Sequence, residues 1–214
     1  MGAQFNIDNI ILEYFNNKKD GFFVEVGVCD PIDQNNTYLL EKNGWKGILI
    51  EPLTRFNDLY AALRPNSIVE NFAMVSKDYP LDYIYFNNST GIDGGFTSTV
   101  SEVESSRFPI RPQPKGTVKC DTLENILIKN GVKDIDFLTI DVEGYEINVM
   151  NGIDISKFNI EVILIESHNE EILLAEFEHS STINSFDYLC EYYDKQILSS
   201  TYHILFTKKV VEEK

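Results

Sequence analysis

The chain has 214 residues, of which 43% are hydrophobic, and this is enough for one α/β domain, residues 1–214, with a buried core. Its formal net charge of −16 argues against a nucleic-acid partner and against an anionic membrane surface. No apolar run approaches the about 18 residues of a transmembrane helix, and we see no signal peptide, so we expect a cytoplasmic protein. The cysteines, Cys29, Cys120 and Cys190, are far apart and odd in number, which is typical of reduced thiols.

The first part of the chain alternates between helical and strand patterns. Apolar residues at helical spacing predict helices over residues 7–17, 36–43 and 54–63, the first within an N-terminal helical segment, residues 1–20. Short β-rich runs predict strands over residues 21–26, 47–51, 67–72 and 81–86. Apolar runs closed by turn residues are typical of strands buried in a parallel sheet.

Residues 87–117 have little periodicity and are rich in glycine, serine and proline. Loops of this length inside a domain are usually lids or binding loops, or they are disordered. We interpret this segment as a substrate loop or lid, and a disordered insertion is the alternative.

The last part of the chain returns to alternating patterns. The expected strands cover residues 118–120, 136–141, 161–166 and 202–206, with 197–198 as a hairpin partner of the last. Helices are expected after Asp121, up to Gly131, and over residues 144–150 and 183–193. Because Glu124 follows Asp121 by three residues, Asp121 is interpreted as a helix N-cap.

The first two strands end in residues that suit a nucleoside. The turn after residues 21–26 contains Gly27, which allows close approach of a ligand or a positive φ. The next strand ends at Glu51, where an ionised carboxylate can accept hydrogen bonds from the two hydroxyls of a ribose. In open α/β sheets the ligand lies outside the carboxyl ends of the strands.

The glycine pattern favours S-adenosylmethionine over a dinucleotide. Cys29 and Ile32 stand where G-x-G-x-x-G requires its other glycines, and a Walker A loop is absent. S-adenosylmethionine has a ribose but no phosphate, and it carries a sulfonium and an ammonium. The carboxylates of Glu25, Asp30 and Glu51 would attract these cations and repel phosphates.

Four predicted strands end in or near an acidic residue. These residues are Glu25, Glu51, Asp141 and Glu166. A carboxylate at the carboxyl end of a strand faces the ligand crevice, whereas one in mid-strand is buried at a cost. We therefore interpret the four as one functional edge, with chance placement in an acidic protein as the alternative.

An ordered set of motifs over residues 4–207 resembles the FkbM-type S-adenosylmethionine-dependent methyltransferases. The matching segments are GFFVEVG at 21–27, NTYLLEK at 36–42, GWKGILIEP at 44–52, NFA at 71–73, DTL at 121–123, FLTIDVEGYE at 137–146 and ESHN at 166–169. The ordered set is specific, although no single motif is. The chain departs from the family pattern at Pro31, where a second glycine is usual, and at Ser167, which separates Glu166 from His168.

The resemblance implies the class I methyltransferase (Rossmann-like) fold. This is a seven-stranded, mostly parallel sheet in the order 3-2-1-4-5-7-6, with helices on both faces and the last strand antiparallel. The resemblance places the methionine end of the cofactor near residue 27, its ribose at residue 51 and its adenine near residue 72. The cofactor-binding residues that it implies are Glu25, Gly27, Asp30, Asn36, Thr37, Glu51, Phe72, Ala73 and Asp141.

Transfer of a methyl group to a hydroxyl requires removal of a proton. The candidates for the general base are His168, Asp141 and Glu143. His168 is favoured because an unperturbed histidine has a pKa of about 6.5. A loop histidine hydrogen-bonded to the backbone is the alternative for His168.

A divalent metal ion, Mg²⁺, is a second way to activate the hydroxyl, because it would lower the pKa of a bound acceptor. The candidate ligands are Asp141, Glu166 and His168, with Glu143 beside them. Glu143 is otherwise expected to stabilise the first turn of its helix.

The sequence as a whole predicts an O-methyltransferase that acts on a hydroxyl of a sugar, a glycan precursor or another small metabolite. It does not identify the acceptor, and a homodimer remains open. A non-catalytic cofactor-binding module of the same fold is one alternative, and a nicotinamide-dependent oxidoreductase is another.

Overall fold

The computed structural model describes residues 6–88, 97–99, 115–166, 184–198 and 203–210, together with residue 3. Its strands are β1 (Phe22–Val26), β2 (Lys46–Ile50), β3 (Ser67–Glu70), β4 (Ala73–Met74), β5 (Tyr83–Asn88), β6 (Thr97–Thr99), β7 (Lys115–Asp121), β8 (Asp134–Ile140), β9 (Asn159–Glu166), β10 (Tyr193–Leu198) and β11 (His203–Lys208). Its α-helices are α1 (Ile7–Tyr14), α2 (Tyr38–Lys42), α3 (Asn57–Leu63), α4 (Leu123–Lys129), α5 (Glu146–Met150) and α7 (Asn184–Tyr192). Turns of 3-10 helix cover Thr54–Phe56 and Ile155–Lys157.

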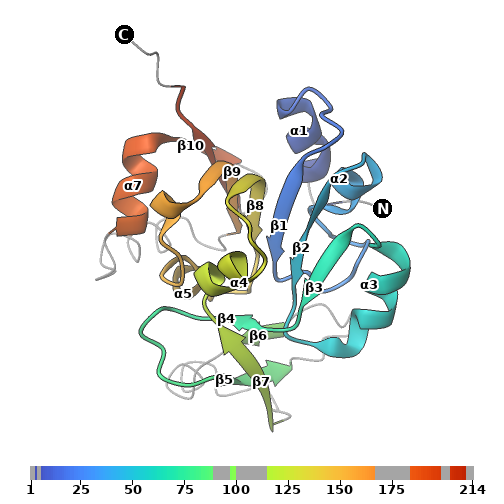
Figure 1. The fold of residues 1–214 in the computed structure, drawn as a ribbon, viewed down its shortest axis with the longest axis vertical. Coiled ribbons are helices and arrows are strands. Elements are labelled where there is room, and N and C mark those ends of the chain that lie inside the picture. Colours follow the sequence, from blue (N-terminus) through green and yellow to red (C-terminus); the bar gives the residue numbers. More distant parts are fainter. Residues whose placement is uncertain are drawn as a thin grey trace.

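The main sheet has seven strands in the order β10-β11-β9-β8-β1-β2-β3 (Figure 1). The five strands from β9 to β3 run parallel, β11 is antiparallel to β9, and β10 is antiparallel to β11. Numbered in chain order, these strands follow 3-2-1-4-5-7-6. The predicted Rossmann-like fold is therefore confirmed, including its antiparallel last strand.

Helices cover both faces of the main sheet. On one face, α1, α2 and α3 bury Ile11, Leu40 and Tyr60 against the strands. On the opposite face, α4 and α5 bury Leu127 and Met150. Because the central strands are covered on both sides, their sequences are almost continuously apolar instead of alternating.

A second, four-stranded sheet has the order β4-β7-β5-β6 and comes from the chain between β3 and α4. The sequence predicted β5 and part of β7, residues 118–120, but not this sheet. The interpretation of residues 87–117 as a loop is wrong for residues 87–88, 97–99 and 115–117. These residues belong to β5, β6 and β7, which pair with one another. Residues 89–96 and 100–114 lie outside the described residues, so a lid there stays a prediction.

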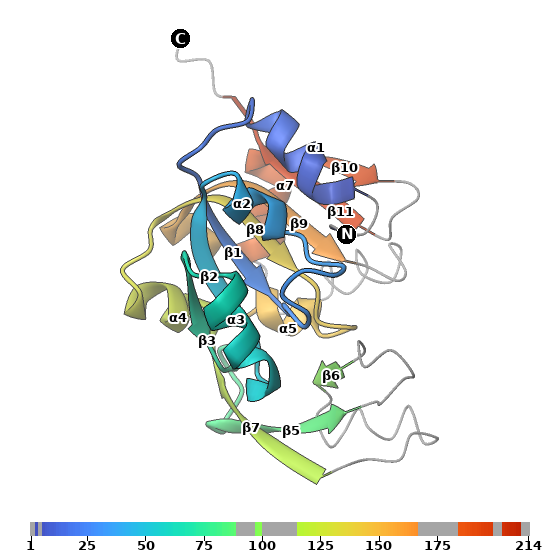
Figure 2. The same cartoon turned by 90° about the vertical axis from the view of Figure 1, so that its right-hand side faces the viewer.

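The second sheet borders the edge of the main sheet at which β8 ends. Ala73, Ile84, Cys120 and Tyr145 share one small apolar core, and Val142 packs against it. Tyr145 and Val142 belong to the segment between β8 and α5. Figure 2 shows β5, β6 and β7 below the main sheet. The inserted strands are thus close to the residues that follow β8.

The N-cap of α4 is Thr122, whereas the sequence predicted Asp121. The Thr122 side chain accepts a hydrogen bond from the Asn125 backbone N–H over 3.2 Å. Asp121 is still part of β7, and its Oδ1 accepts from Thr122 N–H and from Asn125 Nδ2. The strand pairing of Asp121 therefore moves the cap one residue along the chain.

Cys29, Cys120 and Cys190 form no disulfide in the structure. Among the described residues, no helix is both long and apolar enough to cross a membrane.

Candidate functional site

Three of the four acidic residues predicted to share an edge, Glu51, Asp141 and Glu166, lie at the ends of neighbouring strands. The fourth, Glu25, lies within β1, and Gly27 follows the end of that strand. The registers of β2 with β1, β1 with β8 and β8 with β9 align the last residues of these strands. In order across the sheet, the residues at the edge are Glu51, Gly27, Asp141 and Glu166. The backbone N–H groups of Gly27 and Asp141 continue the strand hydrogen bonds, each over 3.0 Å.

Gly27 is required by its conformation and by its neighbour. Its φ is +89°, which is unfavourable for residues with a side chain. A Cβ atom at this position would lie 1.7 Å from the backbone oxygen of Asp141. Only glycine therefore allows the turn after β1 to contact the turn after β8.

Glu51 is buried, with 6% of its surface exposed, and is held by two backbone groups. Its Oε2 accepts from Cys29 N–H over 3.1 Å, and its Oε1 accepts from Leu53 N–H over 2.9 Å. Burial raises the pKa of Glu51, while these hydrogen bonds oppose the rise. Each carboxylate oxygen keeps a further lone pair, so Glu51 can still accept hydrogen bonds from two hydroxyls.

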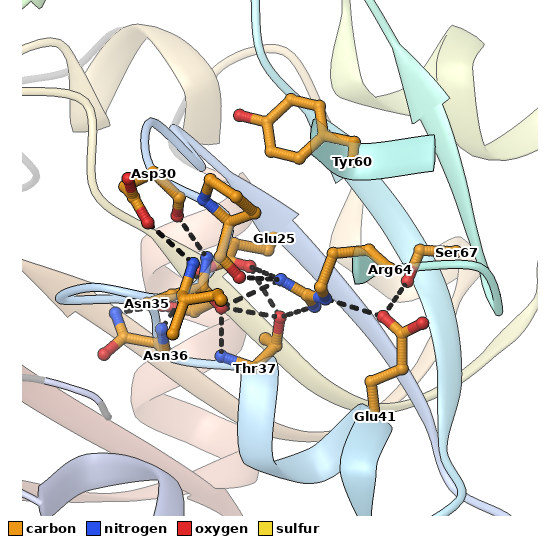
Figure 3. Close-up of polar contacts among 12 residues, drawn as sticks. Glu25, Asp30, Asn35, Asn36, Thr37, Glu41, Tyr60, Arg64 and Ser67 are labelled. Atoms are coloured by element: carbon orange, nitrogen blue, oxygen red, sulfur yellow. Dashed lines mark hydrogen bonds and ion pairs between the residues drawn. The ribbon is translucent and has the colours of Figure 1, made fainter. Parts of the chain in front are cut away.

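Glu25 lies within β1 and is directed into the protein. Its Oε2 accepts from the Thr37 hydroxyl over 2.5 Å, and its Oε1 accepts from Asn36 N–H over 3.2 Å (Figure 3). Burial raises its pKa, and the nearby Arg64 guanidinium opposes this rise. The observed contacts make Glu25 a support for residues 35–37, and a direct contact with a cofactor stays a prediction.

Arg64 was not identified from the sequence, although it is 1% exposed and lies at the centre of Figure 3. Its Nε donates to Glu41 Oε2 over 2.6 Å, and its Nη1 donates to Asn35 Oδ1 over 3.0 Å. Tyr60, one helical turn earlier on α3, is also buried. The i, i+4 spacing of Tyr60 and Arg64 was therefore the sequence signal that could have indicated a buried Arg64.

Asp30 stabilises the turn after β1. Its Oδ1 accepts from the N–H groups of Ile32 and Asp33, each over 2.8 Å. This is the local side-chain-to-backbone pattern of an Asx turn. The structure thus gives Asp30 a local role, and its predicted contact with the methionine end stays a prediction.

Asp141 and Glu166 bring two carboxyl groups into contact at the ends of β8 and β9. Burial raises the pKa of Asp141 well above its usual value, and a hydrogen bond to Glu166 raises it further. The charges of Glu143 and Glu146 act in the same direction. This edge of the sheet is therefore strongly acidic and can bind a proton or a cation.

The turn between β8 and α5 is fixed by Glu146. Its Oε1 accepts from Val142 N–H and Gly144 N–H, each over 3.1 Å, and burial raises its pKa. Glu143 in the same turn has a φ of +58°, which is uncommon for a residue other than glycine. The strained backbone places Glu143 in the turn that follows Asp141.

His203 lies at this edge, although it was not identified from the sequence. His203 begins β11, pairs in register with Glu166 and is 3% exposed. Alternation along β11 was the signal for it, because His203 and Leu205 share a face of the strand. His168, the predicted base and metal ligand, lies outside the described residues.

The two residues predicted near an adenine follow β3. Phe72 is partly buried, and the Lys129 ammonium lies 5.3 Å from the centroid of its ring. Ala73 is 2% exposed and begins β4. Asn71 donates from Nδ2 to the backbone oxygen of Glu51 over 2.9 Å, which ties this segment to the end of β2.

Comparison with known proteins gives one family match. A family model described as the methyltransferase FkbM domain matches residues 25–193, which is more than half of the chain. No curated protein matches the chain.

Solved structures with a similar arrangement include several methyltransferases. An rRNA methylase from Streptococcus thermophilus has 8% identity and a TM-score of 0.43, with 94% of this chain and 93% of that chain covered. A precorrin-6Y C5,15-methyltransferase from Geobacter metallireducens has 9% identity and a TM-score of 0.43, with 98% and 93% covered. A precorrin-8W decarboxylase from Methanobacterium thermoautotrophicum has 12% identity and a TM-score of 0.45, with 96% and 90% covered.

Proposed function

This chain belongs to the FkbM methyltransferase family, and from that premise we propose that it transfers a methyl group from S-adenosylmethionine to a hydroxyl group. The proposed acceptor is a sugar, a glycan precursor or another small metabolite. This acceptor class is the one that the sequence resemblance implies.

The observation that carries the proposal is the joint position of Gly27 and Glu51 at the ends of β1 and β2. Glu51 Oε2 accepts from the N–H of Cys29 in the turn after Gly27, so turn and carboxylate are held together. The remaining lone pairs of Glu51 suit the two ribose hydroxyls, and the acidic edge suits a cationic ligand. The residues present therefore fit S-adenosylmethionine, which when bound supplies an electrophilic methyl group on sulfur.

The acceptor would bind at the other half of the edge. The backbone of Asp141 lies against Gly27, which we assign to the cofactor site, and Asp141 adjoins Glu166 on β9. Their carboxyl groups can accept hydrogen bonds from an acceptor hydroxyl and orient its oxygen. Positioning of two reactants can contribute about 7–11 kcal/mol to lowering a barrier. The general base would be Asp141, Glu143 or His168.

The position of the second sheet favours a binding site for a small acceptor near this half of the edge. It packs against Val142 and Tyr145, directly after Asp141. Segments inserted at the carboxyl edge of an α/β sheet commonly shape the binding site. We assign to this sheet and to residues 87–117 the recognition of the part of the acceptor that does not react.

Isothermal titration with S-adenosylmethionine and S-adenosylhomocysteine tests the cofactor assignment. We expect Glu51→Ala to weaken both affinities at least about tenfold, because two hydroxyl contacts are lost. Asp58→Asn is the matched control, since Asp58 is an exposed acid on α3. Unchanged affinity in Glu51→Ala would show that Glu51 does not bind the ribose.

A transfer assay tests the reaction. Wild-type protein is incubated with methyl-labelled cofactor and a panel of sugars and sugar nucleotides, and the products are analysed for methyl ethers. Label on a hydroxyl oxygen supports the proposal. Cofactor binding without transfer to any member of a broad panel, or transfer only to nitrogen or carbon, contradicts it.

A further inference from the structure

Three side chains that can bind a metal ion converge at one end of β8, β9 and β11. Asp141, Glu166 and His203 each offer one ligand atom, and these three atoms lie within 4.8 Å of one another. The strand registers explain the convergence, because Glu166 pairs directly with His203 and aligns with the residue that follows β8. Neighbouring strands with aligned registers present these side chains on the same face.

We propose that Asp141, Glu166 and His203 form a site for one divalent cation of the Mn²⁺ or Zn²⁺ type. The role given to the site below rests on the proposed function, but its existence does not, because cation binding is measured without turnover. The site differs from the one expected from the sequence, since the histidine comes from β11 and not from residue 168.

The donor set determines the class of metal. Carboxylate oxygens suit Mg²⁺, Ca²⁺ and Mn²⁺, whereas an imidazole nitrogen suits Zn²⁺ and other transition metals. Two carboxylates with one imidazole therefore favour Mn²⁺ or Zn²⁺ over Mg²⁺. Three protein ligands also leave at least one coordination position for water or substrate, as catalytic zinc sites do.

The spacing of the ligand atoms is close to that of a bound ion. Ligands about 2.1 Å from a tetrahedral ion are about 3.4 Å from one another. Since the present atoms lie within 4.8 Å, small side-chain rotations would bring them into coordination. The strand backbones would not have to move.

The charges at the site also favour a cation. The ligand atoms of Asp141 and Glu166 lie within 4.8 Å of each other, and two more acids, Glu143 and Glu146, follow in the next turn and helix. Two ionised carboxylates in contact repel each other unless a proton or a cation lies between them. A metal ion between Asp141 and Glu166 would offset this repulsion.

A separate observation concerns Asn36. It is 4% exposed, and its Nδ2 donates to Thr139 Oγ1 on β8, two residues before Asp141 and on the same face. Its Oδ1 accepts no hydrogen bond from the residues that the structure describes. A buried acceptor requires a donor, and metal-bound water is a donor that the proposed site would supply.

The role of the ion follows from its open position. An acceptor hydroxyl bound there would have a lowered pKa, so it would lose its proton more readily at neutral pH. The cofactor would remain at Gly27 and Glu51. The metal ligands and the cofactor site would then lie on neighbouring strands of one edge.

The test is titration of the full chain, stripped with EDTA, with Mn²⁺ and separately with Zn²⁺. Calorimetry should give one ion per chain, and loss of the free Mn²⁺ signal in electron paramagnetic resonance should agree. We expect His203→Asn and Glu166→Gln each to weaken binding at least about tenfold. Asp134→Asn should bind as wild type, because Asp134 is an exposed acid at the opposite end of β8.

Two results would overturn the proposal. One is the absence of stoichiometric binding by wild-type protein at ion concentrations up to about 1 mM. The other is wild-type affinity in His203→Asn. Circular dichroism shows whether each variant is folded, and if one is not, a rise in the wild-type Tm with Mn²⁺ supports the site and an unchanged Tm opposes it. Failure of the cofactor titration would contradict the proposed function without changing this result.

Discussion

Arg64 and Glu41 form a buried ion pair in which the guanidinium Nε donates to Oε2 over 2.6 Å. The same guanidinium lies 4.0 Å from Glu25 Oε2 and donates from Nη2 to the Thr37 hydroxyl over 2.7 Å. One cation thus offsets two buried carboxylates. It also holds Asn35 and Thr37, in the segment between β1 and α2, in place.

Replacement of Arg64 by methionine should destabilise the fold strongly. Glu25 and Glu41 would then be buried without their cation, and removal of one partner from a buried pair typically costs about 3–5 kcal/mol. The free energy of unfolding, measured by urea denaturation with circular dichroism, checks this. Lys133→Met, at an exposed position, is the control and should stay within about 0.5 kcal/mol of wild type. A similar small change in both variants would contradict the structural role of Arg64.

Gly27→Ala should destabilise more than alanine at another glycine with positive φ. Both Gly27 and Gly131 have positive φ, but only at Gly27 would the Cβ meet a backbone atom, Asp141 O at 1.7 Å. Gly131→Ala has nothing within 4 Å and should cost about 1 kcal/mol from strain alone. Urea denaturation of the two variants gives the difference. Equal costs would show that the two turns are not in contact.

Thr122→Ala should lower the free energy of unfolding by about 1 kcal/mol, because α4 would lose its N-cap hydrogen bond to Asn125 N–H. Thr54→Ala, at an exposed threonine, is the matched control. Thermal unfolding followed by circular dichroism is sufficient to detect the difference. If Thr122→Ala were as stable as the control, the cap would have no energetic role.

Stability at acid pH should depend on Glu124. Burial alone would raise its pKa, but hydrogen bonds from Lys157, Lys77 and the Asp154 backbone lower the pKa to about 2. A carboxyl whose pKa is lowered on folding stabilises the protein above its unfolded pKa of about 4.3, and this stabilisation is lost as the pH falls to about 2. Wild type should therefore exceed Glu124→Gln in unfolding free energy at pH 6, and the two should converge towards pH 2.

The comparison with Glu124→Gln is needed because other acids act in the opposite direction. Burial raises the pKa of Glu25 and Glu51, so their protonation favours the folded state as the pH falls. Subtraction of the two stability curves removes these contributions. A difference that stays constant from pH 6 to pH 2 would contradict the lowered pKa of Glu124.

The main sheet could be predicted because its signals are local. The strands at Glu51 and Asp141 are short apolar runs that end in an acid, and such runs report burial on both faces. Their order came from the resemblance and not from the runs themselves. The second sheet could not be predicted, because β6 and the start of β7 depend on pairing with residues distant in sequence.

The sequence identified the residues at the ends of β1 and β2 but not the buried residues around them. Gly27 and Glu51 carry a recognisable pattern of turn and strand end. Arg64 and His203 do not, because their importance arises from neighbours on other elements, Glu41 for Arg64 and Glu166 for His203. Charge burial and cross-strand pairing are properties of the folded chain, so no single stretch of sequence reports them.

The absence of a side chain at Gly27 couples the positions of the turns that follow β1 and β8. Because the tip of β1 rests on the carbonyl group of Asp141, neither turn can shift without displacing the other. The distance between the donor and the recipient of the methyl group would then be set by the rigid centre of the sheet. Changes in what the protein modifies would have to come from segments added around this centre, such as the inserted strands β4 to β7.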